Sequence, residues 1–352
     1  MKEKINTAII GFGLSGRVFH SSLIESLEEF NLSKIYTTNN NSQEYIRKTY
    51  KNTKIVEDIE HIFNDKSIEL VVISVPNKFH FELSKKALKS NKNVIVEKPF
   101  TVTSNEADEL IQLSEEKNKI LTVYQNRRWD SDFRTITKIV NKNWLGNLVE
   151  YEAHFDRFRN YFKNKWKEKK GSGSGILYDL GSHLIDQAQC LFGTPNEIFA
   201  DIRTQRLGGE VDDNFEIILY YNNLKVTLKA GMLVKEELPR YILLGDKGSY
   251  IKYGMDIQEE ELKKEKKPNE TEEWGKESEN QWGIINTEID GINIKGKVQS
   301  ERGDYREFYK NVYKAIVNGE ELEVKAKDVR NTIRLIELAI ESNQNKKIVK
   351  FR

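Results

Sequence analysis

The sequence predicts an α/β protein in two parts: a doubly wound parallel sheet, followed by an α+β part with an open, mainly antiparallel sheet. Its 352 residues exceed what a single core usually organises. Up to about residue 123, short apolar runs alternate with helical segments, as in parallel βαβ units. Beyond that point, strand pairs joined by tight turns dominate. We therefore expect one domain over 1–123 and a second over 124–352.

Composition excludes several classes of protein. Acidic and basic residues nearly cancel, at a net charge of +1, so the overall charge does not favour a nucleic-acid or anionic-membrane partner. No apolar run approaches the length of a membrane span, and the N-terminus does not read as a secretory signal. The single cysteine, Cys190, lies among apolar residues and is expected in the core. These features together fit a reduced, cytoplasmic location.

The first element is a strand, a glycine turn and a helix, "TAIIGFGLSGRVFH" at residues 7–20. Its glycines follow the G-x-G-x-x-G pattern, in which the first permits a tight turn and the third lets the helix pack on the strand. The second lets a pyrophosphate approach the backbone, and the helix N-terminus favours the anion. The position at the first strand strengthens the pattern. The predicted dinucleotide-binding residues of this turn are Gly11, Phe12, Gly13, Leu14, Ser15 and Gly16.

The second strand ends without a carboxylate, in "IYTTNNN". An acid at this place commonly binds the ribose hydroxyls of NAD. Here Thr37 and Thr38 can donate hydrogen bonds to a 2′-phosphate, which an acid would repel. The pattern therefore favours NADP over NAD. The alternative is that these residues form a solvated turn and that the choice of cofactor is loose.

Further βα units follow, with strands expected at 70–75, at 94–96 and in "ILTVYQN". Ligands bind at the carboxyl ends of the strands in such sheets. A lysine in the segment "EKP" is costly to bury without a role. The cofactor-binding residues predicted at these strand ends are Ser74, Pro76, Asn77, His80, Glu97, Lys98 and Asn126.

In the second part, "YDLGSHLIDQ" at 178–187 places Asp179, His183 and Asp186 at helical spacing on one stripe. An ordinary helix-surface pair would show the same spacing. Asp186 is expected either to hydrogen-bond His183 or to join a structural polar cluster. The chain has five histidines and no H-x-x-x-H or C-x-x-C spacing, so no metal site is predicted.

The other elements of the second part are strands, a loop and a terminal helix. Alternating apolar residues predict a hairpin over 214–231 and a strand pair over 240–254. The basic, glycine- and serine-rich stretch before "YDLGSHLIDQ" is expected to be a mobile loop, with Arg157 among the candidates to close over a substrate. The charged segment 258–283 is expected at the surface, and an amphipathic helix near the C-terminus.

"GFGLSGRVFH", "SVPNKFH", "EKPF" and "YDLGSHLIDQ", in this order, resemble the signature segments of the Gfo/Idh/MocA oxidoreductases. "YQNRRWDSDF" and "GILYDLGSHLIDQ" look more narrowly like the NADP-dependent scyllo-inositol dehydrogenase branch. The resemblance covers essentially the whole chain. It implies an N-terminal Rossmann domain, a C-terminal sheet that binds substrate on one face, and a homodimer or homotetramer formed through that sheet.

The resemblance also implies roles for single residues. Lys98 matches the lysine beside nicotinamide and substrate, His183 the acid/base histidine, and Asp179 the substrate-binding aspartate. We expect these three to be catalytic, and Lys98, Arg127, Arg157, Asp179 and His183 to contact the substrate. The expected reaction is hydride transfer between NADP, or NAD, and a secondary alcohol of a cyclic polyol or sugar. Two alternatives stay open: a regulator that binds cofactor and sugar without turnover, and a reductase of a non-sugar substrate.

Overall fold

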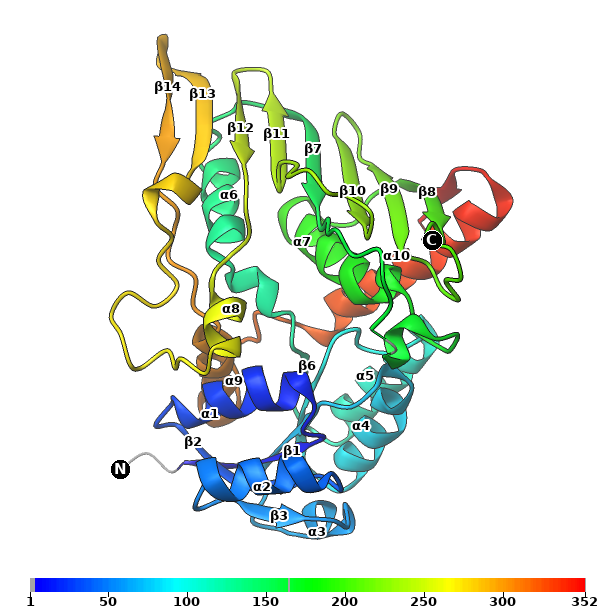
Figure 1. The fold of residues 1–352 in the computed structure, drawn as a ribbon, viewed down its shortest axis with the longest axis vertical. Helices are drawn as coiled ribbons and strands as arrows, with labels where there is room; N and C mark the ends of the chain where they lie inside the picture. The colour runs from blue at the N-terminus through cyan, green and yellow to red at the C-terminus, as the bar shows by residue number, and fades with distance from the viewer. Residues whose placement is uncertain (1–3, 164, 352) are drawn as a thin grey trace. The chain divides into compact units, whose positions relative to one another are not determined.

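The computed structural model describes residues 4–163 and 165–351, and the chain divides into two compact units (Figure 1). Unit 1 contains the residues up to Asn126 together with Gln258–Trp274 and Asp304–Arg330. Unit 2 contains Arg127–Ile257, Gly275–Gly303 and the residues from Asn331 onward. The first boundary lies close to the one expected from the sequence. The two later segments of unit 1 were expected in the second domain.

Unit 1 is built on a six-stranded parallel sheet with the order β3-β2-β1-β4-β5-β6. Its strands are β1 (Ile5–Ile10), β2 (Phe30–Tyr36), β3 (Lys54–Val56), β4 (Leu70–Ile73), β5 (Asn93–Val96) and β6 (Leu121–Val123). From β1 the chain adds strands β2 and β3 on one side, and then β4, β5 and β6 on the other side. The position between β1 and β4 is therefore the switch point, and doubly wound sheets bind ligands there, beyond the carboxyl ends of the strands. This confirms the predicted doubly wound sheet.

Unit 1 contains the helices that connect its strands and two helices from its later segments. They are η1 (Gly16–Ser21), α1 (Ser22–Glu25), α2 (Asn40–Thr49), α3 (Glu60–Phe63), η2 (Asn77–Phe79), α4 (His80–Lys89), α5 (Ser104–Glu116), α8 (Gln258–Lys263) and α9 (Arg306–Asn318). The strand β4 reads "LVVI" and is buried throughout, as a strand covered on both faces requires. The helix α5 begins at a capping box, because Thr103 accepts from the Glu106 backbone and Glu106 accepts from the Thr103 backbone.

Unit 2 is built on a nine-stranded sheet with the order β14-β13-β12-β11-β7-β10-β9-β8-β15. Only the pairing of β7 with β10 is parallel, so the sheet is mainly antiparallel, as predicted. Its strands are β7 (Leu148–His154), β8 (Glu197–Arg203), β9 (Asn214–Tyr220), β10 (Lys225–Gly231), β11 (Tyr241–Gly245), β12 (Gly248–Lys252), β13 (Gly283–Ile289), β14 (Ile292–Val298) and β15 (Val349–Lys350).

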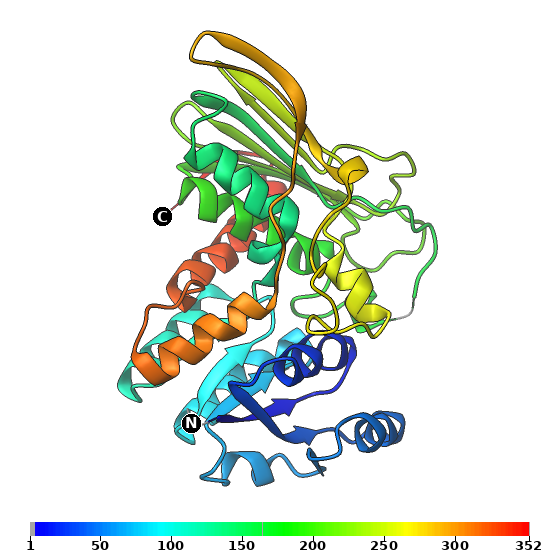
Figure 2. The same cartoon turned by 90° about the vertical axis from the view of Figure 1, so that its left-hand side faces the viewer.

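Helices cover one face of this sheet (Figures 1 and 2). They are α6 (Ser131–Asn141), α7 (Ser182–Phe192) and the part of α10 (Ala326–Asn345) that belongs to unit 2; shorter helical turns are η3 (Asn126–Trp129), η4 (Trp166–Glu168), η5 (Leu177–Gly181) and η6 (Glu279–Gln281). Alternation along β9 buries Phe215, Ile217 and Leu219 and leaves Glu216 exposed. The predicted hairpin is confirmed, with Leu219 opposite Val226. Within the described residues, no helix is long and apolar enough to cross a membrane.

Candidate functional site

The glycine turn follows β1 and leads into η1. Gly11 has a φ of +95°, and a Cβ there would lie 2.2 Å from the Ser74 carbonyl oxygen. A Cβ on Gly16 would lie 2.3 Å from the Gly11 carbonyl oxygen. Packing within the protein therefore requires both of these glycines. Apart from Gly13 itself and its two chain neighbours, no described residue has an atom within 4 Å of a Cβ built on Gly13. The open space at Gly13 is the room that a pyrophosphate needs to approach the backbone, so the turn fits a dinucleotide.

The other predicted residues of this turn have different surroundings. Phe12 is buried and packs its ring against the rings of Tyr45 and Tyr50, at centroid distances of 6.2 and 6.3 Å. Leu14 is 52% exposed, and the Ser15 hydroxyl donates to the carboxylate of Glu97. Phe12 therefore has a packing role in addition to its place in the turn, and Ser15 ties the turn to the end of β5.

Beyond β2, Thr37 is buried, Thr38 is exposed, and the Asn39 side chain caps α2 by accepting from the Ser42 backbone at 2.9 Å. The amide nitrogen of Gln43 donates to the Thr37 carbonyl and, at 2.6 Å, to the carboxylate of Glu57. Glu57 follows β3, the neighbour of β2, and lies exposed at this same edge.

Sequence reasoning missed this carboxylate. It considered only the residues after the second strand, whereas the sheet order places the end of β3 next to them. The signal in the sequence that could have identified Glu57 is its position directly after the third strand of a βαβαβ unit. The absence of an acid directly after β2 therefore carries less weight for NADP than the sequence implied.

After β4, the chain turns through Pro76 and Asn77 into η2, and Asn77 is buried. His80 is fully buried, with Nδ1 2.8 Å from the Pro99 carbonyl oxygen and Nε2 2.9 Å from the Val75 carbonyl oxygen. Burial lowers the pKa of His80, so the ring is neutral at pH 7. A neutral ring donates to only one of these two carbonyl oxygens, but both ring nitrogens of His80 face backbone carbonyls of the segments after β4 and β5.

Glu97 and Lys98 lie at the carboxyl end of β5. Burial alone would raise the pKa of Glu97, but hydrogen bonds from His20 and Ser15 and nearby positive charge hold it at about 2. Its Oε2 accepts the Lys98 backbone N–H at 2.9 Å. Lys98 is half-buried, and its bond to Pro99 is cis. The β5 end thus presents a lysine beside a buried, ionised carboxylate.

The end of β6 lies beside that of β5, since Val96 pairs with Val123. Lys98 lies two positions after Val96, and Gln125 lies two positions after Val123, so the two residues are at the same level beyond the sheet. Gln125 is 1% exposed, and its amide oxygen and nitrogen have no hydrogen-bond partner among the described residues. Such a group is a candidate for a functional constraint, because an unpaired buried amide is costly. The pattern of apolar and polar residues in the sequence could not identify Gln125 as a candidate. Asn126, which was predicted to bind cofactor, is also buried.

In unit 2, η5 and α7 carry the predicted acid/base pair. The Asp179 carboxylate accepts from Lys167 Nζ at 2.5 Å, and Lys167 belongs to η4. His183 is 5% exposed, and its ring centroid lies 6.2 Å from that of Phe155. One helical turn separates Asp179 from His183, so both lie on one face of the helix, as predicted.

The structure brings one further predicted residue to this face. The Arg127 guanidinium lies 5.7 Å from the centroid of Phe155, the same ring that His183 approaches. Arg157 belongs to the segment that follows β7, and its backbone N–H donates to the Gly231 carbonyl oxygen at 2.9 Å. Unit 2 therefore places the Arg127 guanidinium and the His183 imidazole near the ring of Phe155, with the Asp179 carboxylate one helical turn from His183.

Two further residues of α7 support one of the open alternatives and correct an expectation. Asp186 accepts from Arg128 through both oxygens, at 2.6 and 2.8 Å, and is 2% exposed. This buried bidentate ion pair places Asp186 in a structural polar cluster. Cys190 is exposed, so its expected place in the core was wrong: it falls on the outward side of the helix although its sequence neighbours are apolar.

Asp212 holds the start of this helix. Its Oδ2 accepts the Leu177 backbone N–H at 2.7 Å, and burial raises its pKa to about 6, against the effect of that hydrogen bond. A carboxyl with a raised pKa adds stability below its unfolded pKa of about 4, and this is lost as pH rises through about 6. We expect Asp212→Asn to abolish a fall of about 1–3 kcal/mol in the free energy of unfolding over that range.

Urea unfolding of wild type and Asp212→Asn at half-unit steps from pH 4 to pH 7 would measure this fall. The difference between the two proteins cancels the titration of other groups. A difference that stays constant with pH would contradict the raised pKa.

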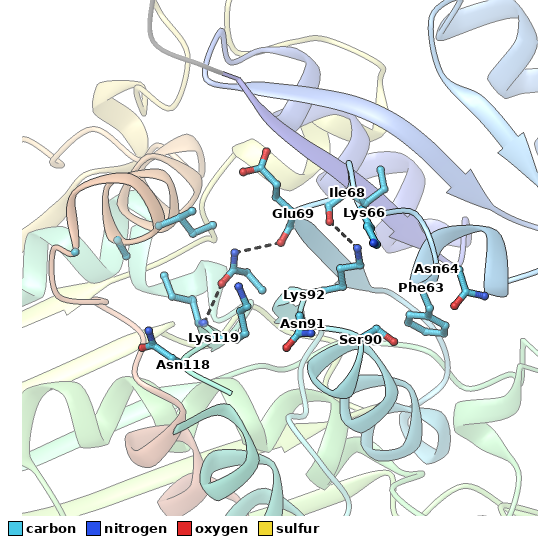
Figure 3. A pocket seen from close by; sticks show the side chains of 15 residues that line it. Phe63, Asn64, Lys66, Ile68, Glu69, Ser90, Asn91, Lys92, Asn118 and Lys119 are labelled. Atoms are coloured by element: carbon cyan, nitrogen blue, oxygen red, sulfur yellow. Dashed lines mark hydrogen bonds between the residues drawn. The ribbon is translucent and has the colours of Figure 1, made fainter. Parts of the chain in front are cut away.

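A cavity of about 870 Å³ lies at the end of the unit 1 sheet where the strands begin, opposite the carboxyl ends that carry the predicted site (Figure 3). It is lined by residues at the amino ends of β4 and β5, and Lys92 there donates to the Ile68 carbonyl at 2.9 Å. None of the predicted site residues lines it. Among the described residues, no group of three or more His, Cys, Asp or Glu side chains could hold a metal ion.

Comparison with known proteins gives a consistent result. Residues 5–125 match the family model described as the oxidoreductase family, NAD-binding Rossmann fold, and residues 137–351 match its C-terminal alpha/beta domain. The scyllo-inositol 2-dehydrogenase (NADP(+)) IolW of Bacillus subtilis is 37% identical over 99% of this chain and 96% of its own. The oxidoreductase YdgJ of Escherichia coli is 38% identical over 98% of both chains.

Solved structures show the same fold. The oxidoreductase YvaA of Bacillus subtilis superposes with a TM-score of 0.96 at 36% identity, over 100% of this chain and 99% of its own. An oxidoreductase of Bacteroides fragilis superposes with a TM-score of 0.90 at 43% identity, over 99% of this chain and 100% of its own.

Proposed function

Because this chain belongs to the Gfo/Idh/MocA family of NAD(P)-binding oxidoreductases, we propose that it transfers hydride between NADP and a secondary alcohol of a cyclic polyol or sugar, such as scyllo-inositol. The observation that carries the proposal is the pair on η5 and α7. A shielded imidazole, His183, lies one helical turn from the carboxylate of Asp179, which Lys167 orients. The name of the IolW relative supports the substrate class and the cofactor.

His183 is the proton acceptor for the alcohol in this proposal, since a neutral imidazole accepts a proton near neutral pH. The Lys98 ammonium stabilises the alkoxide as the proton leaves. Asp179 accepts a hydrogen bond from a neighbouring hydroxyl of the substrate and so fixes which carbon reacts. Arg127 and Arg157 complete the polar lining, which suits a polyol better than an apolar substrate. When bound, the nicotinamide supplies the hydride chemistry.

The cofactor would be held by residues of unit 1. The open space at Gly13 fits the pyrophosphate, and Thr37, Thr38 and Asn39 lie where the adenosine ribose binds in this kind of sheet. We propose NADP because hydroxyl and amide groups, not a carboxylate, follow β2 directly. Glu57 lies at the same edge, so a direct comparison of the two cofactors is needed.

The test measures reduction of NADP and NAD at 340 nm with scyllo-inositol, myo-inositol, glucose, xylose and glucose 6-phosphate. We expect turnover with a cyclic polyol and a higher kcat/KM with NADP. The sugar phosphate is included because a glucose-6-phosphate 3-dehydrogenase of Bacillus subtilis is 30% identical over half of this chain. Tight cofactor binding without turnover of any of these substrates would overturn the proposal in favour of a regulator or a non-sugar reductase.

A further inference from the structure

Three buried side chains of unit 1 form a continuous hydrogen-bonded chain behind the glycine turn. His20 lies in η1 and is 0% exposed. Its Nε2 lies 3.0 Å from Glu97 Oε1, and its Nδ1 lies 2.6 Å from the hydroxyl oxygen of Tyr309 in α9. The His20 ring also packs on Tyr124 at a centroid distance of 4.5 Å. The imidazole is therefore held on both nitrogens and on one face.

The chemistry of Glu97 fixes the direction of the hydrogen bond that it shares with His20. Glu97 is ionised, with its pKa held at about 2, and can only accept, so His20 Nε2 carries the hydrogen. Burial, and then the charge of Glu97, raises the pKa of Tyr309 well above its usual value, so the phenol keeps its proton. Donation from Nε2 to Glu97 leaves Nδ1 facing the Tyr309 hydroxyl, which can either donate a hydrogen bond to this nitrogen or accept one from it.

The chain ends on two segments that the proposed reaction needs. Glu97 Oε1 also accepts from the Ser15 hydroxyl, which lies within the glycine turn. Glu97 Oε2 accepts the backbone N–H of Lys98 at 2.9 Å. A single carboxylate thus joins the turn that would hold the dinucleotide to the peptide that carries the proposed catalytic lysine.

We propose that Tyr309, His20 and Glu97 form a positioning relay, which fixes the glycine turn and the Lys98 backbone relative to one another. The proposal rests on the dehydrogenase function proposed above, because that function gives the turn and Lys98 a common task. A buried carboxylate keeps its place only while its hydrogen-bond partners do. The helix α9, near the C-terminus of the chain, thereby controls the geometry of a turn near its N-terminus. The three residues act through Lys98 and the turn rather than on the substrate.

The direct test is the tautomer of His20. With ¹⁵N-labelled histidine, the chain's five histidines give few signals, and His20→Gln assigns the one that belongs to His20. We expect a ring that carries a proton at Nε2, and a shift of its Nδ1 signal in Tyr309→Phe. A ring protonated at Nδ1 alone would overturn the proposed direction, since Nε2 could not then donate to Glu97.

The functional test uses paired variants. His20→Gln keeps a donor and an acceptor, whereas His20→Leu removes both at similar volume. Tyr309→Phe removes one hydroxyl, and Tyr313→Phe is its matched control, because Tyr313 lies one turn further along α9 and packs on Phe30. NADPH affinity is measured by nicotinamide fluorescence without any substrate, and thermal unfolding identifies variants that fail to fold.

We expect the NADPH dissociation constant to rise about 10-fold in His20→Leu and Tyr309→Phe, as for a lost buried hydrogen bond. His20→Gln and Tyr313→Phe should stay near wild type. Equal impairment of His20→Gln and His20→Leu would overturn the relay, because ring shape alone would then matter. So would unchanged NADPH binding in a folded Tyr309→Phe. These outcomes need no turnover, so they remain separate from a failure of the proposed function; where turnover is found, kcat should fall more than KM rises.

Discussion

His183→Ala is expected to lower kcat by about 10²- to 10⁴-fold, the usual contribution of a general acid/base residue. The imidazole is shielded from solvent and one helical turn from Asp179, so no neighbouring group on α7 replaces it. The dissociation constant for NADPH should change little, because His183 belongs to unit 2 and the glycine turn to unit 1. Steady-state kinetics with the best polyol, together with a fluorescence titration of NADPH, would measure both quantities.

The matched control is His61→Ala. His61 is exposed on α3 and takes no part in the proposed site, so kcat should be unchanged. Lys98→Ala should reproduce the loss seen in His183→Ala, and the double variant should lose little more, because residues that act as a unit are not additive. A kcat for His183→Ala within a few-fold of wild type would refute its role as the proton acceptor.

Gly13→Ala is expected to weaken NADPH binding without loss of stability, whereas Gly16→Ala is expected to lower stability. A Cβ on Gly13 meets no atom within 4 Å from any described residue beyond its chain neighbours, so the melting temperature should stay near that of wild type. The methyl group would instead occupy space needed by the pyrophosphate, and we expect the NADPH dissociation constant to rise about 100-fold or more, roughly 3 kcal/mol. Isothermal titration calorimetry and differential scanning calorimetry would measure the two effects.

Gly16→Ala should lose stability, because its Cβ would lie 2.3 Å from the Gly11 carbonyl oxygen and the turn would have to shift. Overpacking of this kind typically costs about 1–3 kcal/mol. The two substitutions add the same atom three residues apart in one turn, so composition and charge are matched. Equal NADPH affinity in Gly13→Ala and wild type would show that the space at Gly13 does not serve the cofactor.

Local pattern was sufficient to predict several elements of this protein. The glycine turn, the apolar runs of β4 and β5 and the hairpin of β9 and β10 all lie where the sequence predicts them. The reason is that each depends on neighbours within about a dozen residues: backbone freedom at glycine, burial on both faces of a strand, and period-two alternation. The same is true of Asp179 and His183, because helical spacing alone places them on one face.

The partners of these residues come from distant parts of the chain, and local pattern carries no information about them. Tyr309 reaches His20 across 289 positions, and Asp186 finds Arg128 across 58. The segments Gln258–Trp274 and Asp304–Arg330 join unit 1 although a change of pattern placed them in the second domain. Glu57 meets the end of β2 only because the sheet order puts β3 beside it.

The sequence therefore determined the type of each element and the chemistry it displays. The tertiary structure decided which buried donor meets which acceptor. Burying Glu97, Asp186 and His20 is costly without partners, and those partners become adjacent only when the complete chain is packed.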